Sequence, residues 1–120
     1  PDSGTTYFLT RAAGTVRATD LLMSGRKFTG KEGADWGLFT EAVPSDHLES
    51  RVRQYVEKYS NGPTVAYGNI KAMINRAQFG SFADGLEAEV ECQGECELTE
   101  DYREAVTAFL EKRKPQFNGK

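Results

Sequence analysis

Hydrophobic residues recur at every third or fourth position along most of this chain, which is the spacing of one face of an α-helix. The clearest stripe lies in residues 46–60 and consists of Leu48, Val52, Tyr55, Val56 and Tyr59. Comparable stripes lie in residues 63–77, 81–96 and 99–114. The pattern predicts one helix over each of these four segments.

Glycine and proline divide the first third of the chain into shorter elements. Apolar spacing predicts helices over residues 5–12 and 16–23, and Gly14 and Gly25 are expected to end them. Residues 38–43 combine Phe, Thr and Val before a proline, a composition that predicts a strand or an extended segment.

Two pairs of residues have the spacing of a helix capping box, in which the first side chain and a Glu three residues later satisfy free backbone N–H groups. Thr29 and Glu32 predict the start of a short helix that ends at Gly37. Asp46 and Glu49 predict the start of the helix over residues 46–60.

Composition limits the chain to one domain and to few partner classes. The 120 residues are 38% hydrophobic and 28% charged, with a net charge of −3. No apolar run approaches the ~20 residues that a membrane span needs, so no membrane partner is expected. The mildly acidic balance argues against nucleic-acid binding. The chain opens on Pro1 without a Met or a secretory segment, so it is expected to lack the beginning of its protein.

The only cysteines, Cys92 and Cys96, are too few for a disulfide framework. Their spacing places them on one helix face, where two partly buried thiols are expected and a redox pair is the alternative. A metal site is not expected, because zinc needs further ligands and the single histidine, His47, lies in another helix. Free thiols favour a reducing, cytoplasmic location.

Charge is distributed unevenly near the end of the chain. Residues 84–101 hold eight acidic side chains and no Lys or Arg, which is typical of a solvated helix face. Lys112, Arg113 and Lys114 follow. This basic triplet suits a helix C-terminus, where cations meet the helix dipole favourably, and it equally suits a phosphate-binding patch.

Three stretches together resemble the enoyl-CoA hydratase/isomerase (crotonase) family, in an order and spacing that cover the whole chain. They are PDSGTTYFLTR at residues 1–11, SGRKFT at 24–29 with WGL at 36–38 and VP at 43–44, and TEDYREAVTAFLEKRKPQF at 99–117. The chain departs from the family where Gly4 is followed by Thr5, since a second glycine is common there. It also has Ala105 where glycine is common.

The resemblance implies an α/β crotonase-like fold, a spiral of ββα units followed by a helical trimerisation region. Residues 1–44 would be the end of the spiral core with an active-site loop, and residues 45–120 the C-terminal helical region. These 120 residues are therefore expected to be mainly α-helical. The N-terminal half, with the sheet and both backbone donors of the oxyanion hole, would be supplied by residues absent here.

The resemblance also implies an acyl-CoA thioester as substrate and Asp2 as the visible catalytic candidate. Isomerases of the family carry an aspartate at this position as a proton shuttle, and a dehalogenase branch uses it as a nucleophile. The hydratases use two upstream glutamates instead. An enoyl-CoA isomerase is favoured, with a hydratase or a thioester hydrolase as alternatives. Without the resemblance, Asp2 before Ser-Gly would be a turn or N-cap residue.

Binding roles follow from the same resemblance. Phe109 matches a position that packs on the adenine of coenzyme A, and Lys112, one helical turn later, matches one that meets the 3′-phosphate. In the family both positions reach the coenzyme A from a neighbouring subunit of the trimer. The alternative is that Phe109 packs in the hydrophobic core and that Lys112 is an ordinary surface residue. Trp36 would line the acyl pocket, although core packing is the simpler interpretation. No cofactor is expected besides coenzyme A as part of the substrate.

The resemblance further implies a cytoplasmic homotrimer or dimer of trimers that acts in fatty acid metabolism. The apolar stripes exceed what four short helices need alone, which agrees with burial between subunits. A non-catalytic helical assembly module is the alternative of another class, and a DNA-binding helical domain is disfavoured by the acidic pI of about 5.2.

Overall fold

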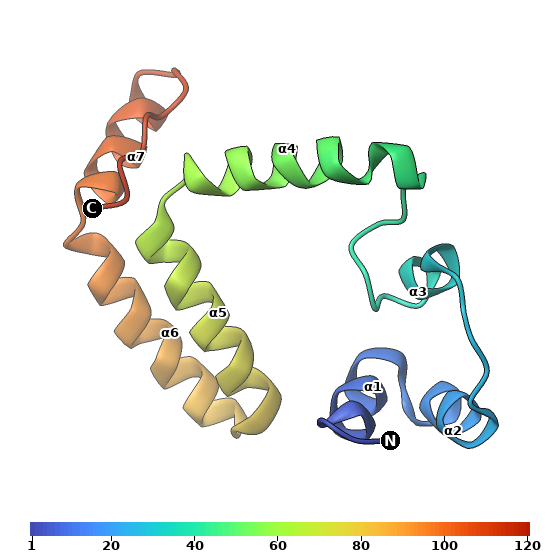
Figure 1. The fold of residues 1–120 in the computed structure, drawn as a ribbon. Helices are drawn as coiled ribbons and strands as arrows, with labels where there is room; N and C mark the ends of the chain where they lie inside the picture. Colours follow the sequence, from blue (N-terminus) through green and yellow to red (C-terminus); the bar gives the residue numbers. More distant parts are fainter. The chain divides into compact units, whose positions relative to one another are not determined.

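The computed structural model describes residues 1–120, and all its regular elements are helical (Figure 1). In chain order they are α1 (Thr5–Ala13), α2 (Thr15–Ser24), α3 (Gly30–Asp35), the 3-10 turn η1 (Ser45–His47), α4 (Leu48–Ser60), α5 (Thr64–Phe79), α6 (Phe82–Glu97) and α7 (Glu100–Leu110). The mainly α-helical expectation is confirmed. No helix is both long and apolar enough to cross a lipid bilayer.

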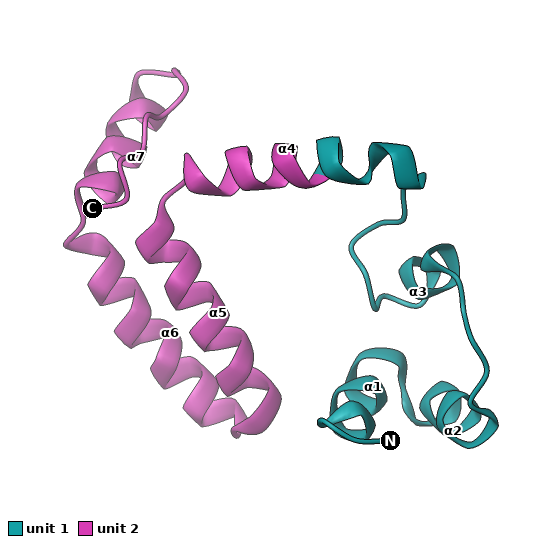
Figure 2. Ribbon diagram, viewed as in Figure 1, with its two compact units in different colours: residues 1–51 teal, residues 52–120 magenta.

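The chain divides into two compact units, residues 1–51 and residues 52–120, with the boundary inside α4 (Figure 2). This boundary lies a few residues after the predicted division at 44/45. The assignment of the two segments to a spiral core and a trimerisation region stays a prediction.

In the first unit, α1 packs against α2, which buries Ala18 and Leu21. Gly14 separates the two helices with a φ of 79°, a backbone region that favours glycine, and its N–H donates to the Thr10 carbonyl. Gly25 ends α2 in a left-handed conformation, as predicted.

The capping box at Thr29 is confirmed. The Thr29 hydroxyl accepts a hydrogen bond from the Glu32 N–H at 3.1 Å, and the Glu32 carboxylate accepts one from the Thr29 N–H at 2.8 Å. These bonds lower the pKa of Glu32, first through the Thr29 N–H. Two local bonds thus start a helix of only six residues.

The next segment departs from the prediction at two points. Of the strand and the extended segment predicted for residues 38–43, the strand does not form, because no second strand is present to pair with their backbone groups. Asp46 and Glu49 form no capping box. Ser45–His47 instead makes a 3-10 turn, closed by a bond from the His47 N–H to the Pro44 carbonyl at 2.9 Å. Asp46 therefore lies inside a turn and not at a cap position.

In the second unit, α5 and α6 pack side by side as an antiparallel hairpin, and α7 contacts α6 (Figure 1). Ser81 starts α6 with a capping box, since its hydroxyl accepts from the Asp84 N–H at 3.2 Å and the Asp84 carboxylate accepts from the Ser81 N–H at 2.7 Å. This box is not evident from the sequence pattern, because Asp84 stands in the place that Glu or Gln usually takes.

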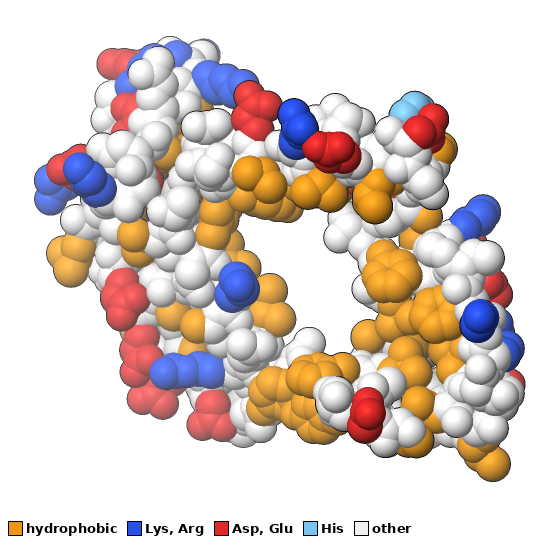
Figure 3. All heavy atoms as spheres, in the orientation of Figure 1, with side chains coloured by type: hydrophobic (Ala, Val, Ile, Leu, Met, Phe, Trp, Pro, Cys, Tyr) orange, Lys and Arg blue, Asp and Glu red, His pale blue; other side chains and the backbone are white.

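The predicted apolar stripes form, but they remain largely uncovered. Only four hydrophobic residues are buried in the chain, namely Ala18, Leu21, Ala88 and Ala108. Large side chains from α4 to α7, such as Val56, Ile74, Leu86 and Val106, are exposed, and Figure 3 shows hydrophobic side chains at the surface along much of the chain.

The last helix is shorter than predicted. α7 ends at Leu110, whereas the sequence predicts a helix to residue 114, because Pro115 is the first helix-breaking residue that follows. Lys112 has a φ of 54°, and the Lys112 and Arg113 N–H groups donate to the Phe109 and Ala108 carbonyls at 3.2 and 3.0 Å. This pair of bonds is the Schellman ending of a helix, which normally has glycine where Lys112 stands.

Candidate functional site

The predicted site residues fall in both units. Asp2 and Trp36 belong to the first unit, and Phe109 and Lys112 belong to the second.

Asp2 occupies a tight turn directly before α1. The Thr5 N–H and the Thr5 hydroxyl both donate to the Asp2 carbonyl, at 2.8 and 2.6 Å. Ser3 and Gly4 follow with φ of 50° and 80°, so the chain reverses in two left-handed residues. A Cβ added at Gly4 would approach the Phe8 ring to 3.0 Å. The main chain of Asp2 is thus held while its side chain is exposed.

Trp36 lies in a cluster of aromatic and cationic side chains at the end of α3. Its ring centroid is 5.3 Å from that of Phe28, which is 6.5 Å from that of Phe39. The guanidinium carbons of Arg17 and Arg26 lie 4.9 and 5.3 Å from the Trp36 ring. Such cation–π contacts hold the indole ring in one orientation.

The same cluster depends on the buried Gly33. A Cβ added there would overlap the ring of Phe39, and the Phe28 ring would lie 3.3 Å away. Arg26 also bonds the carboxylates of Asp20 and Glu32, each at 3.3 Å. Trp36 is therefore a packed residue, and its place in an acyl pocket stays a prediction.

Phe109 and Lys112 lie at the end of α7, but not as two residues of one helix face. Phe109 is 83% exposed on the last turn, so it is not core. Lys112 follows the helix in the left-handed turn and is also exposed. The prediction that Lys112 lies one helical turn after Phe109 is wrong, because the helix ends before Lys112. The bond from the Lys112 N–H to the Phe109 carbonyl nevertheless keeps the two residues adjacent.

Arg113 differs from its neighbours in the basic triplet. Its two terminal nitrogens bond the two oxygens of Glu104 at 2.6 and 2.9 Å, and its Nε bonds Glu111 at 2.7 Å. The hydrogen bonds from Arg113 and from the Gln116 N–H lower the pKa of Glu104 to about 2. Lys112 makes no ion pair, so its ammonium group, unlike the Arg113 guanidinium, is available to an anionic ligand.

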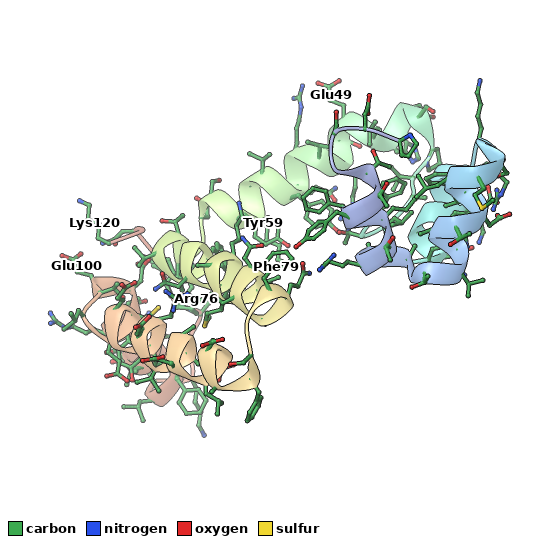
Figure 4. All side chains as sticks on the ribbon, turned by 90° about the horizontal axis from the view of Figure 1, so that it is seen from below. Glu49, Tyr59, Arg76, Phe79, Glu100 and Lys120 are labelled. Atoms are coloured by element: carbon green, nitrogen blue, oxygen red, sulfur yellow. The ribbon has the colours of Figure 1, made fainter.

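Residues 111–120, here termed the C-terminal strap, run back along α7 to its first turn. The buried carboxylate of Asp101, 3% exposed, accepts the N–H groups of Asn118 and Gly119 at 2.7 and 2.9 Å. Figure 4 shows Glu100 and Lys120 near one another at this end. The prediction that the acidic residues 84–101 form a solvated helix face is therefore wrong for Asp101.

Asp101 and Glu104 are the functional candidates that sequence reasoning missed. The partner of Glu104, Arg113, lies nine residues away in the predicted helix, and the partner of Asp101, Asn118, lies 17 residues away beyond the predicted helix end. No helical periodicity connects such positions. The one available signal was the abrupt change from acidic to basic side chains on either side of α7.

A groove of about 1290 Å³ runs between α5 and α6 and is lined by Ile70, Met73, Leu86, Cys92 and Cys96 among others. Both cysteines are free and partly buried on this one face, as predicted. The Asn69 amide donates to the Cys92 carbonyl at 3.4 Å and to the Cys96 sulfur at 3.5 Å. The redox alternative stays a prediction.

Comparison with protein families places this geometry in context. A family model described as enoyl-CoA hydratase/isomerase matches residues 1–120. A 1,2-epoxyphenylacetyl-CoA isomerase of Escherichia coli is 36% identical over 120 residues, which are 100% of this chain and 46% of that protein. A trans-2-decenoyl acyl-carrier-protein isomerase of Streptococcus mutans is 32% identical over the same shares.

Solved structures agree with the sequence relatives. The crystal structure of an enoyl-CoA hydratase from Bacillus anthracis superposes with a TM-score of 0.89 at 33% identity, covering 100% of this chain and 46% of that one. The chain thus spans about half the length of the curated relatives that it matches, and it corresponds to their C-terminal half.

Proposed function

The chain belongs to the enoyl-CoA hydratase/isomerase family, and from this premise we propose that it is part of an acyl-CoA enzyme that shifts a double bond, with Asp2 as acid and base. The observation that carries the proposal is the place of Asp2 in the PDSGT segment, in a turn that fixes its backbone and leaves its carboxylate exposed. The relative named as a trans-2-decenoyl acyl-carrier-protein isomerase supports the choice of reaction.

In the proposed reaction, the Asp2 carboxylate removes a proton from the α-carbon of a 3-enoyl thioester. The electron pair moves onto the thioester oxygen as an enolate, which two backbone N–H groups of the N-terminal half stabilise. The enolate then collapses as Asp2 returns the proton to the γ-carbon. A carboxylate within reach of both carbons suffices for this transfer, and the proposal includes no resident cofactor.

Coenzyme A would be held by the second unit. Phe109 offers an exposed ring for the adenine, and Lys112 offers a cation without a carboxylate partner for the 3′-phosphate. Trp36 would line the acyl pocket. We further propose that the uncovered stripes are buried against an N-terminal half and in a cytoplasmic homotrimer or dimer of trimers serving fatty acid metabolism.

Hydration is the second candidate, because a solved enoyl-CoA hydratase superposes on the whole chain. In that case glutamates upstream of Pro1 would carry the chemistry. A hydrolase or dehalogenase with Asp2 as nucleophile is a third possibility, and a non-catalytic assembly module is the alternative of another class.

The test compares two reactions of the full-length enzyme, in which residues 1–120 are joined to the preceding half that its relatives possess. We expect isomerisation of a 3-enoyl-CoA to exceed hydration of a 2-enoyl-CoA, and Asp2→Asn to abolish the former. Full isomerase activity in Asp2→Asn would contradict the role of Asp2. Absence of both reactions together with absence of coenzyme A binding would favour the assembly module.

A further inference from the structure

We propose that Glu104, acting through Arg113, is a positioning residue that sets Lys112 for the 3′-phosphate of coenzyme A. This inference rests on the proposed function, and it adds a residue pair whose role is to shape the phosphate site. Neither member of the pair needs to touch the ligand.

The backbone of Lys112 requires an outside constraint. Its φ of 54° lies in the region that residues other than glycine avoid, because Cβ crowds the following carbonyl group. Such a residue persists when the surrounding structure holds it there. If Lys112 relaxed to a helical φ, α7 would continue past Leu110, and the turn that now carries Lys112 would be lost.

Arg113 supplies that constraint through its bidentate bond to Glu104 at 2.6 and 2.9 Å. An extended α7 would carry Arg113 away from Glu104, since nine positions along a helix are about two and a half turns. The bond to Glu104 is therefore compatible with the turn and not with a longer helix. The lowered pKa of Glu104, about 2, agrees with a carboxylate that stays ionised in this pairing.

The strap holds the turn from its other end. Glu104 also accepts the Gln116 N–H at 2.8 Å, and Asp101 accepts two further N–H groups of the strap. The Asp101 N–H donates to the Lys120 carbonyl at 3.0 Å. Gly119, with a φ of 78°, passes so close to Thr64 of α5 that a Cβ would lie 2.7 Å from its hydroxyl. The turn at Lys112 is thus fixed between two anchored segments.

The pairing also selects which cation faces the ligand. Two carboxylates, Glu104 and Glu111, surround the Arg113 guanidinium, whereas Lys112 has neither as a partner. A phosphate group beside the turn would therefore meet the unpaired ammonium group of Lys112 and not the guanidinium of Arg113. Removing the pair should release the backbone of Lys112 and weaken binding of the 3′-phosphate. The affinity for the rest of coenzyme A should stay unchanged.

The experiment measures the affinities of the full-length enzyme for coenzyme A and for 3′-dephospho-coenzyme A by calorimetry. The test variant is the double change Glu104→Gln and Arg113→Gln, which breaks the pair while conserving net charge. Its matched control is Glu91→Gln and Arg76→Gln, which removes another Arg–Glu pair of the same unit, bonded at 2.8 Å. A third variant, Lys112→Ala, reports the phosphate contact itself.

We expect the wild type and the control to prefer coenzyme A by about 10-fold, the size of one charge-assisted contact. The test variant should lose most of that preference and keep its affinity for 3′-dephospho-coenzyme A. Arg113→Lys, which keeps the charge but not the bidentate geometry, should lie between the two.

The outcomes separate the inference from the proposed function. If Lys112→Ala abolishes the preference and the test variant retains it, the positioning role is overturned while the binding role of Lys112 stands. If Lys112→Ala retains the preference, Lys112 does not bind the 3′-phosphate and the proposed site itself is wrong. If the test variant and Arg113→Lys both lose affinity for coenzyme A and for 3′-dephospho-coenzyme A to the same extent, the pair has a structural role only. That result also overturns the inference.

Discussion

Two turns of this chain hold a residue other than glycine in left-handed backbone, and each lies at a candidate site. Ser3, with a φ of 50°, follows Asp2, and Lys112, with a φ of 54°, is itself a candidate. The first turn is closed by Thr5, three residues from Asp2. The second is held by Glu104 and Asp101, across separations of 9 to 18 residues.

The difference shows two ways in which one chain can fix a strained backbone. The Asp2 turn uses neighbours in sequence, so its geometry belongs to the PDSGT segment. The Lys112 turn uses charge pairs and a folded-back strap, so its geometry belongs to the whole second unit. Backbone strain of this kind clusters at functional sites in proteins, which is why both turns are candidates for experimental test.

The largest effect should separate chemistry at the first turn from binding at the second. In the full-length enzyme, we expect Asp2→Asn to lower kcat by roughly 100-fold or more, because the proton shuttle is lost. Lys112→Ala should raise KM about 10-fold at nearly unchanged kcat, because one charge-assisted contact is removed. Steady-state kinetics on a 3-enoyl-CoA measures both, and equal effects on kcat would contradict the division of roles.

A smaller effect tests how far the first turn depends on its glycine. Gly4→Ala should lower the free energy of unfolding by about 1–2 kcal/mol, since alanine is disfavoured at a φ of 80° and its Cβ would crowd Phe8. Gly68→Ala is the matched control, because Gly68 lies inside α5 in open space. It should raise stability by up to about 1 kcal/mol. Denaturant unfolding measures both, and a stable Gly4→Ala variant would show that the turn is not needed.

Relief of strain should be smaller again and should differ between the turns. Ser3→Gly and Lys112→Gly each remove a side chain from left-handed backbone, and each should raise stability by roughly 0.5–1 kcal/mol. Lys112→Gly should nevertheless bind coenzyme A more weakly, whereas Ser3→Gly should not. Thermal unfolding and calorimetry test this, and a destabilised Lys112→Gly would show that the side chain, not the backbone, supports the turn.

The smallest effect concerns pH at the second turn. The bonds from Arg113 and Gln116 depress the pKa of Glu104 from its ordinary 4.5 to about 2. Because the folded-state pKa is the lower one, the stabilisation is fully present above pH 4.5 and is lost as the pH falls towards 2. An NMR titration should show the Gln116 amide changing near pH 2. A change centred near 4.5 would mean that Glu104 is not held by Arg113.

Sequence reasoning succeeded where the signals are local. The ends of α1 and α2 at Gly14 and Gly25, and the capping box at Thr29, follow from residues at most four positions apart. It failed where a pattern could be continued in more than one way. The apolar stripe of the last helix stops at Leu110, but the next helix-breaking residue is Pro115, so the sequence leaves open whether residues 111–114 continue the helix.

The sequence by itself determined the family and the mainly helical character, because the spacing of apolar residues and the motifs at both ends of the chain are properties of neighbouring residues. Only the tertiary structure decided that Asp101 is buried, that Arg113 is paired and that Lys112 leaves the helix in a left-handed turn. The physical reason is that these features depend on hydrogen bonds between residues distant in sequence, which form only when the strap folds back along α7.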